Sequence, residues 1–343
     1  MKSGSEVIRA KAPLRLSFAG GGTDVPPFPE NEGGFVLSAT IDRAAFASLS
    51  PRDDRAVTVT SHDLGREASF QVGDQIHFDG NLDLAKAAVR RVIDKEAGGF
   101  DVTLRSSAPP GSGLGASSAV VVALIGAMQA HYRTPLTSYE IAELAYLVER
   151  QDLGIAGGLQ DQYAATFGGF NFIEFHADHV VVNPLRIDDE TVRELEHNLL
   201  LVDTGRTRMS DHIIADQTSR YLGGEPGAID ALRRQKQLAV EMKNALLQRR
   251  PRVFGELLDE AWHEKRRMSP RIATGYIDDA YEAAKKAGAI GGKVTGAGGG
   301  GYMLFYLGEG TRPLVTESLV NLGLTVTDFG FSRQGLTTWR AWP

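Results

Sequence analysis

The sequence predicts an α+β fold made of two domains, residues 1–187 and residues 188–343. The chain has 343 residues, of which 42% are hydrophobic and 23% charged, and this ordinary globular composition is enough for two domains. Short segments with β-type alternation follow one another between residues 34 and 73, which indicates antiparallel pairing. A new unit begins near residue 188, ahead of a buried strand expected at 199–205.

The composition argues against several classes of protein. A net charge of −6 disfavours a broad basic surface for nucleic acid. The chain contains no cysteine, so it has neither disulfides nor thiolate metal sites. No apolar run reaches the roughly 18 residues that a membrane span needs, and the N-terminus lacks the apolar core of a secretion signal. We therefore expect a cytoplasmic protein without a membrane or nucleic-acid partner.

The first half is expected to begin with a strand at 7–19, which runs into the turn GGGTD at 20–24. Three glycines allow the backbone to approach a ligand closely, although a surface hairpin would also use them. The four segments GFVLSATI, AAFASLS, AVTVTS and EASFQV are expected to be successive strands of an antiparallel meander. A helix over about 82–96 follows and is ended by two glycines.

The segment SSAPPGSGLGASSA at 106–119 gives the sharpest functional signal. It follows a short β-type segment at 100–104 and precedes an apolar helix that runs to about residue 132. Glycines let backbone N–H groups approach an anion, and the helix start adds free N–H groups and the positive end of its dipole. This pattern predicts a phosphate cradle, with Ser117 and Ser118 within reach of a phosphate oxygen or Mg²⁺. A plain linking turn is the alternative.

Two common phosphate-loop motifs do not fit this segment. A Walker loop requires a lysine after the glycines, and none is present. Gly111, Gly113 and Ala116 match the dinucleotide pattern GxGxxG/A, but that motif needs a second strand that ends in an acid about 20 residues later. Instead, residues 137–140 (TSYE) resemble a capping box that opens another helix. The nicotinamide interpretation is therefore weak.

Two carboxylates near this loop are candidates for chemistry. Glu149 borders the apolar stripe of a helix expected at 138–150, where a lone glutamate is usually a surface acid. Asp161 follows the glycine turn at 157–158, so it can enter a cleft with little steric hindrance or can cap the helix that begins there. Asp152 is a weaker alternative to Asp161.

The later part of the chain offers an anion-binding turn and a second glycine cluster. Arg206, Arg208 and Ser210 follow the turn Thr204-Gly205 and are equally compatible with an anion site and with solvent-facing side chains. The cluster at 291–301 matches GxGxxG only through composition, because a strand follows it. The remaining expected elements are strands at 170–175 and 179–185, helices at 226–248 and 251–266, a strand at 302–307, a helix at 311–322, and strands near 325–331 and 336–339.

Three segments together resemble the motifs of the GHMP kinases, the galactokinase, homoserine, mevalonate and phosphomevalonate kinase superfamily. PPGSGLGASSA is similar to the ATP loop, KAPLR followed by GGGTD to the first motif, and KVTGAGGGG at 293–301 to the third. They occur in the family's order, and the resemblance spans essentially the whole chain. The form APLRLSFAGGGTDVPPF resembles the heptose-phosphate and fucose branch, whereas galactokinases have Glu-His in place of Gly21-Gly22.

The resemblance implies a fold, a reaction and a set of site residues. The fold is a ribosomal protein S5 domain 2-like N-terminal domain followed by a ferredoxin-like C-terminal domain, with the active site between them. The reaction is phosphoryl transfer from MgATP to a sugar hydroxyl. Asp161 is the implied catalytic aspartate, Arg15 lies by the transferred phosphate, and Ser118 with Glu149 holds Mg²⁺. The implied ATP-binding residues are Pro110, Gly111, Ser112, Gly113, Leu114, Gly115, Ala116, Ser117 and Ser118. The implied substrate-binding residues are Gly20, Gly21, Gly22, Thr23, Asp24, Arg208, Gly298 and Gly299.

The segment T-G-x-x-R-x-S at 204–210 extends the resemblance to heptose-phosphate kinases, which phosphorylate the anomeric hydroxyl of a sugar that already carries a 7-phosphate. Arg208 is the implied phosphate ligand, with Arg206, Lys265 and Arg266 as further candidates. An L-fucose-type kinase is the alternative, and a non-catalytic sensor of sugar and ATP is a third hypothesis. The expected partners are ATP and a small sugar phosphate, and the expected state is a monomer or a homodimer.

Overall fold

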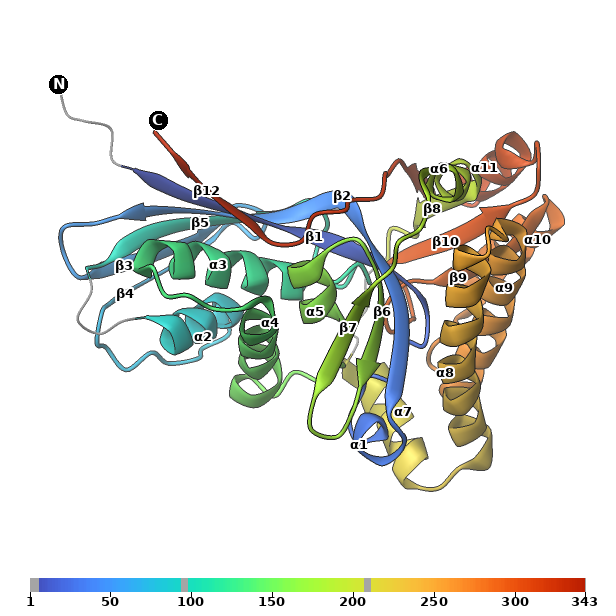
Figure 1. Ribbon diagram of the computed structural model, residues 1–343, viewed down its shortest axis with the longest axis horizontal. Coiled ribbons are helices and arrows are strands. Elements are labelled where there is room, and N and C mark those ends of the chain that lie inside the picture. Colours follow the sequence, from blue (N-terminus) through green and yellow to red (C-terminus); the bar gives the residue numbers. More distant parts are fainter. Residues whose placement is uncertain (1–5, 94–97, 207–210, 343) are drawn as a thin grey trace.

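A computed structural model describes residues 6–93, 98–206 and 211–342 of the chain. It contains two β-sheets that lie at opposite ends of an elongated molecule, each with its own helices (Figure 1). Within the described residues, no helix is both long enough and apolar enough to cross a membrane. The α+β fold class predicted from the sequence is confirmed.

The first sheet has eight strands. Six of them follow the order β12-β1-β2-β5-β3-β4, while β6 pairs with the beginning of β2 and β7 pairs with β6. Its strands are β1 (Val7–Ala19), β2 (Gly34–Pro51), β3 (Ala56–Ser61), β4 (Arg66–Gln71), β5 (Phe100–Ser106), β6 (Phe170–Phe175), β7 (Val180–Pro184) and β12 (Thr337–Ala341). β2 pairs with β1 along one edge, while its other edge pairs with β6 near its start and with β5 near its end.

The antiparallel meander expected between residues 34 and 73 is wrong in two respects. The first two expected strands form one continuous strand, β2, because Asp42-Arg43-Ala44 contains neither glycine nor proline to interrupt it. β3 does not pair with β2, because β5 lies between them and pairs in parallel with β3. β5 supplies the buried residues Phe100, Val102 and Leu104, which fit a central position in the sheet.

Five helical segments pack on one face of this sheet (Figure 1). They are α2 (Asp83–Val92), α3 (Ala116–Tyr132), α4 (Ser138–Leu147), the single π-helical turn η1 (Val148–Asp152) and α5 (Gln160–Phe167). α3 is apolar around most of its circumference and is buried over most of its length, as expected for a helix that neighbours enclose. The expected capping box is confirmed: the Thr137 hydroxyl accepts from the Glu140 amide, and the Glu140 carboxylate accepts from the Thr137 amide.

The second half of the chain folds around a four-stranded antiparallel sheet. Its elements are α6 (Asp189–Asn198), β8 (Leu199–Asp203), α7 (Asp211–Leu222), α8 (Pro226–Leu247), α9 (Pro251–Met268), α10 (Gly275–Lys286), β9 (Ala289–Val294), β10 (Tyr302–Leu307), α11 (Arg312–Asn321) and β11 (Thr325–Thr327). The strand order β11-β8-β10-β9 is the order 4-1-3-2 of a ferredoxin-like βαββαβ unit, as expected. α6, α7, α10 and β9 were not among the predicted elements.

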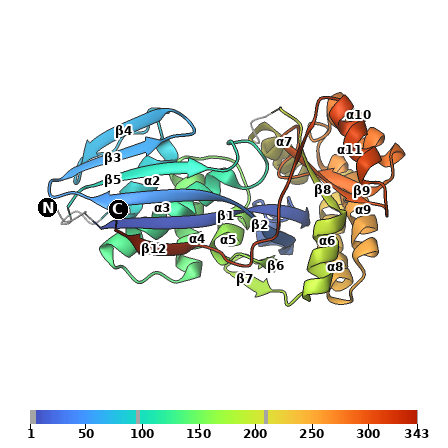
Figure 2. The same ribbon diagram turned by 90° about the horizontal axis from the view of Figure 1, so that it is seen from above.

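Beyond β11 the chain returns to the first sheet. Phe331 forms a bridge with Ile41, and β12 then pairs antiparallel with β1, so that this segment straps the two halves together (Figure 2). Leu336 packs on α3 so closely that a Cβ on Gly126 would lie 2.7 Å from its Cδ1 atom. With the domain division that we propose after residue 187, β12 crosses back into the N-terminal domain.

Aromatic rings join the two halves beside this strap. Phe18 of β1 meets Phe254 of α9 edge to face at a centroid distance of 5.1 Å. Phe331 of the strap lies 4.6 Å from Phe170 of β6. Such pairs contribute about 0.5–1.5 kcal/mol beyond their buried area, so the junction is an apolar core and not a hinge filled with water.

The capping box gives a test of the fold. Thr137→Ala removes the bond to the Glu140 amide and should lower the free energy of unfolding by about 0.5–2 kcal/mol. Thr274→Ala is the matched control, because Thr274 is the N-cap residue of α10 but its side chain makes no capping bond. Denaturant unfolding measures both variants, and an equal loss in the two would contradict the capping assignment.

Candidate active site

A cavity of about 180 Å³ lies where segments from both halves of the chain converge. β1 and the turn after it, the glycine loop before α3, η1 and the start of α5 line it from the first half. α7, α9 and the loop after β9 close it from the second half. Because no single element encloses the cavity, it exists only when the two halves are packed together.

The glycine loop at 111–118 has the backbone of an anion cradle. Gly111, Gly113 and Gly115 have φ angles of 77°, 77° and 73°, which only glycine adopts without strain. These angles turn the loop into the first residue of α3, where the free N–H groups and the helix dipole favour negative charge. Gly111, Ser112, Gly113, Gly115, Ala116, Ser117 and Ser118 line the cavity. Leu114 is buried instead in the core.

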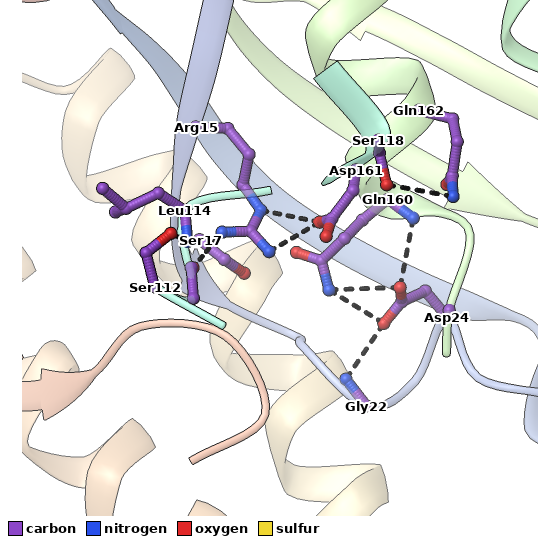
Figure 3. Close-up of polar contacts among 12 residues, drawn as sticks. Arg15, Ser17, Gly22, Asp24, Ser112, Leu114, Ser118, Gln160, Asp161 and Gln162 are labelled. Atoms are coloured by element: carbon purple, nitrogen blue, oxygen red, sulfur yellow. Dashed lines mark hydrogen bonds and ion pairs between the residues drawn. The ribbon is translucent and has the colours of Figure 1, made fainter. Parts of the chain in front are cut away.

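Arg15 connects this loop to Asp161 (Figure 3). It follows an irregularity in the β1–β2 pairing, and such bulges redirect side chains near active sites. Its guanidinium meets Asp161 Oδ1 at 2.8 Å from Nε and at 2.6 Å from the terminal Nη2 atom. It also donates to the Gly113 carbonyl, and the Arg15 amide donates to the Leu114 carbonyl at 3.0 Å. The pair is therefore fixed against the loop.

Asp161 faces the cavity and does not cap its own helix. Leu159 is the N-cap residue of α5, so of the two interpretations open at the sequence level the geometry favours the cleft. No hydrogen bond from a described residue reaches its second oxygen, Oδ2, and its side chain keeps 24% exposure. Asp152, the weaker alternative, pairs with Arg90 and Arg91 of α2 and lies outside the cavity lining.

Asp24 ties the turn after β1 to the start of α5. Its carboxylate accepts from the Gly22 amide at 3.0 Å, and from the amide and the side-chain Nε2 of Gln160 at 3.1 Å (Figure 3). It thus satisfies the first free amide of a helix that has no cap of its own. Gly158 is required here, because a Cβ at this residue would lie 1.9 Å from Asp24 Oδ2.

The five residues of the GGGTD turn do not all face the cavity. Gly21, Gly22 and Asp24 line it. Gly20 lies against β2, where a Cβ would come within 1.8 Å of the Phe35 carbonyl oxygen. Thr23 is fully buried, and its hydroxyl bonds to the backbone of Gly20 and Phe35. Gly20 and Thr23 therefore shape the turn, although both were predicted to contact the substrate.

Ser118 and Glu149 form a buried oxygen pair beside the loop. The Ser118 hydroxyl donates to the Glu149 carboxylate at 2.9 Å, and burial raises the pKa of this carboxyl above its ordinary value. Gln162 also donates to Glu149, while its own Oε1 is buried without a partner. Hydroxyl and carboxylate oxygens suit Mg²⁺, which proteins usually hold with one or two carboxylates together with substrate phosphates. The motifs did not single out Gln162, although it stands next to Asp161.

The glycine cluster before β10 closes the cavity from the second half. Gly296 and Ala297 line it. The predicted contacts Gly298 and Gly299 turn instead toward Ile272: the Gly299 amide donates to its carbonyl at 2.8 Å, and a Cβ on Gly298 would lie 2.9 Å from its side chain. Lys293 is buried below the cluster, where it donates to the Ser17 carbonyl and burial lowers its pKa well below the usual value.

Four cationic residues were candidates for binding the phosphate of the acceptor sugar. The structure describes the surroundings of three of them: Lys265, Arg206 and Arg266. Lys265 of α9 lines the cavity. Arg206 lies over the Tyr276 ring, 4.0 Å from its centroid, and Arg266 pairs with Asp278 at 3.1 Å, so both are occupied elsewhere. Arg208 lies outside the described residues.

A second, apolar cavity of about 380 Å³ adjoins the glycine loop. It shares four residues with the first cavity: Leu84, Ala116, Ser117 and Ile155. The rest of its lining includes Pro110 and the leucines Leu64, Leu82, Leu104 and Leu153. Its size and lining suit a flat apolar group attached to an anion in the loop. Except at the loop, sequence motifs did not predict it, because its leucines have the same pattern as core residues.

Comparison with known proteins places this geometry in a family. Residues 83–169 match the model of the GHMP kinases N terminal domain, and residues 242–312 match that of the GHMP kinases C terminal domain. The chain is 37% identical over 339 residues to the D-glycero-alpha-D-manno-heptose 7-phosphate kinase of Campylobacter jejuni subsp. jejuni serotype O:2, and the match covers 98% of this chain and 99% of that protein.

Two other relatives extend the comparison. A crystal structure described as a D-glycero-D-manno-heptose 1-phosphate kinase from Bacteroides thetaiotaomicron gives a TM-score of 0.82 at 35% identity, over 98% of this chain and 100% of that one. The bifunctional fucokinase/GDP-fucose pyrophosphorylase of Arabidopsis thaliana is 25% identical over 86% of this chain, which spans 29% of that protein.

The contact between Gly158 and Asp24 gives a test of the site's construction. Gly158→Ala should displace the Asp24 carboxylate and lower the free energy of unfolding by about 1–3 kcal/mol. Gly275→Ala is the control, since a Cβ there meets nothing within 4 Å. If thermal and denaturant unfolding find Gly158→Ala as stable as its control, the junction between the turn and α5 does not depend on this close approach.

Proposed function

This chain belongs to the GHMP kinases, which transfer a phosphoryl group from ATP to an alcohol, and we propose that its acceptor is D-glycero-D-manno-heptose 7-phosphate. The proposed product is the 1,7-bisphosphate, formed at the anomeric C1 hydroxyl, for the synthesis of a nucleotide-activated heptose used in capsule, lipopolysaccharide or S-layer glycans. The observation that carries the choice of acceptor is the 37% identity to a heptose 7-phosphate kinase along 98% of the chain.

The phosphates of ATP would lie in the glycine loop. The residues of this loop other than Leu114 line the cavity, and their backbone amides together with the start of α3 would bind the phosphate oxygens. The adjoining apolar cavity would hold the adenine ring between leucine side chains. The two cavities meet at Ala116 and Ser117, so one nucleotide can occupy both.

Arg15 and Asp161 would carry the chemistry. Asp161 lines the cavity, and its Oδ2 atom would accept the proton of the attacking hydroxyl, while Oδ1 is held by Arg15. Arg15 also contacts the glycine loop, so its charge lies where negative charge develops on the transferred group. This arrangement suits phosphoryl transfer, in which positioning and electrostatics dominate.

Ser118 and Glu149 would hold Mg²⁺. The metal ion would neutralise part of the charge on the ATP phosphates. Gln162 would keep the carboxylate of Glu149 directed at Ser118, since its amide contacts both side chains. Gly21, Gly22 and Asp24, at the other side of Asp161, would hold hydroxyls of the sugar.

Two alternatives are less well supported. The first alternative is an L-fucose-type kinase, supported by the 25% identity to a plant fucokinase. That identity is lower than the 37% identity to the heptose 7-phosphate kinase. A non-catalytic sensor would not need Asp161, Glu149 and Ser118, yet all three are present and directed into one cavity. The C. jejuni and B. thetaiotaomicron relatives also differ in name, as kinases of a heptose 7-phosphate and of a heptose 1-phosphate.

A substrate panel tests the proposal. Heptose 7-phosphate, heptose 1-phosphate, unphosphorylated heptose and L-fucose are each offered with ATP and Mg²⁺, and ³¹P NMR identifies the position of the new phosphate. We expect efficient turnover of heptose 7-phosphate with an anomeric phosphate as product. Turnover of fucose without turnover of heptose 7-phosphate would overturn the acceptor but not the kinase activity.

Asp161→Asn should lower kcat by at least about two orders of magnitude, the usual scale for a positioned proton acceptor, and should leave ATP affinity within about twofold. Asp152→Asn is the control and should retain most of the activity, because Asp152 is occupied by Arg90 and Arg91. Steady-state kinetics and nucleotide titration measure both. Near-normal kcat in Asp161→Asn would remove this residue from the mechanism.

Glu149→Gln should raise the Mg²⁺ concentration needed for half-maximal ATP binding by about tenfold or more, because it replaces a charged oxygen ligand. Glu143→Gln serves as control, since Glu143 is an exposed acid of α4 outside this cavity. Calorimetric titration of ATP at a series of Mg²⁺ concentrations gives the comparison. Identical Mg²⁺ dependence in the two variants would mean that Glu149 is not a metal ligand.

A further inference from the structure

Lys265 differs from the other buried lysines of the molecule. Three lysines are nearly inaccessible to solvent among the residues that the structure describes: Lys86, Lys265 and Lys293. Lys86 pairs with Asp79, and Lys293 donates to the Ser17 carbonyl. Lys265 is 4% exposed, yet in the described part of the chain it donates no hydrogen bond and forms no ion pair. Its ammonium group lines the central cavity.

The ammonium of Lys265 lies on the acceptor side of that cavity. A Cβ placed on Gly21 would be 4.0 Å from Lys265 Nζ and 3.6 Å from Gln160 Nε2. Gln160 in turn bonds the carboxylate of Asp24, so Lys265 stands beside the turn proposed to hold the sugar. Amide groups of Gly22 and Gln160 donate to the Asp24 oxygens, and no ion pair joins Asp24 to Lys265 among the described residues.

A buried ammonium without a counterion is costly, because burial takes the charge out of bulk water and no described residue supplies a balancing anion. Burial is the main cause that lowers the pKa of Lys265 to about 8. Of the nearby charges, that of Asp24 raises this pKa and that of Arg15 lowers it. The group is still largely protonated at neutral pH. A neutral sugar hydroxyl would not balance its charge, whereas a phosphate dianion would do so and supply acceptors for its three N–H donors.

We propose that Lys265 binds the phosphate that the acceptor sugar already carries, and that it thereby selects phosphorylated over unphosphorylated sugars. This inference rests on the proposed function and names the residue that sets its specificity. The anionic group would enter the cavity beside Gly21, opposite Gln160. Its contact with Lys265 would be a charge-assisted hydrogen bond, the stronger class of hydrogen bond in proteins.

Kinetics with two matched acceptors test the assignment. In Lys265→Met, kcat/KM for heptose 7-phosphate should fall by at least about tenfold, mainly through KM, because a charged hydrogen bond is lost. The value for unphosphorylated heptose and the KM for ATP should change by less than about threefold. Lys265→Arg should restore most of the preference for the phosphorylated sugar. Arg266→Met, next in the chain and paired with Asp278, is the control and should keep it.

The pH profile of the unmodified protein provides a second test that needs no folding of a variant. Lys265 carries its charge below its pKa, so kcat/KM for heptose 7-phosphate should fall as pH rises through about 8, and unphosphorylated heptose should show no such fall. Asp24, Arg15 and Lys293 are the charged groups that act on Lys265, and the other charged residues that line the cavity are Asp161, Asp211, Glu149 and Arg150. Lys293 is the other amine among these groups, and burial lowers its pKa as well.

Lys265→Arg separates the two lysines, because an arginine keeps its charge at these pH values. If the decline at high pH disappears in this variant, Lys265 is its source, and if it persists, the inference is overturned. Equal losses for both sugars in Lys265→Met would also overturn it, since they indicate a structural role. Failure of the unmodified protein to phosphorylate heptose 7-phosphate would instead refute the proposed function, so the two failures can be told apart.

Discussion

The guanidinium of Arg15 is the interaction on which the site depends. It holds Asp161 on one side and the carbonyl of Gly113 on the other, while its own amide bonds to Leu114. Three segments that are distant in the sequence are therefore fixed by one residue of β1. Because β1 lies within the eight-stranded sheet, the spacing between the glycine loop and the Asp161 carboxylate is fixed by a strand that has partners on both sides. The irregularity before Arg15 is the local distortion that makes this possible.

The two halves of the site approach each other closely through backbone, in addition to long side chains such as that of Lys293. A Cβ on Gly113 would lie 2.5 Å from the Thr295 carbonyl oxygen, and the Tyr302 amide donates to the Ser112 carbonyl. The glycine loop and the cluster before β10 are thus pressed together at the cavity floor. This close packing explains the glycines in both segments, and it leaves Lys265 of α9 as the charged side chain that enters from the second half next to Gly21.

Local patterns in the sequence predicted most elements and brought the main polar residues together correctly. Arg15, Asp161, Ser118 and Glu149 stand in short motifs, and each lines the central cavity. Pairing between distant segments was harder to foresee: the neighbour of β3 is β5, which follows some 40 residues later, and an alternating pattern cannot specify its partner. The direction of each residue within the GGGTD turn was likewise invisible, since it depends on contacts with Phe35. The apolar cavity could not be predicted from the sequence, because its leucines have the same pattern as residues of a hydrophobic core.

The strap formed by the residues after β11 has a consequence for how the protein is made. β12 pairs with β1, so one edge of β1 has its partner only after the whole ferredoxin-like unit has been translated. Until then the residues of β1 that pair with β12, from Val7 to Lys11, present an edge without its partner strand. Such an edge readily captures foreign strands. β1 is completed by β12, so nascent molecules on one messenger RNA remain open to mispairing with each other until β12 has been synthesised.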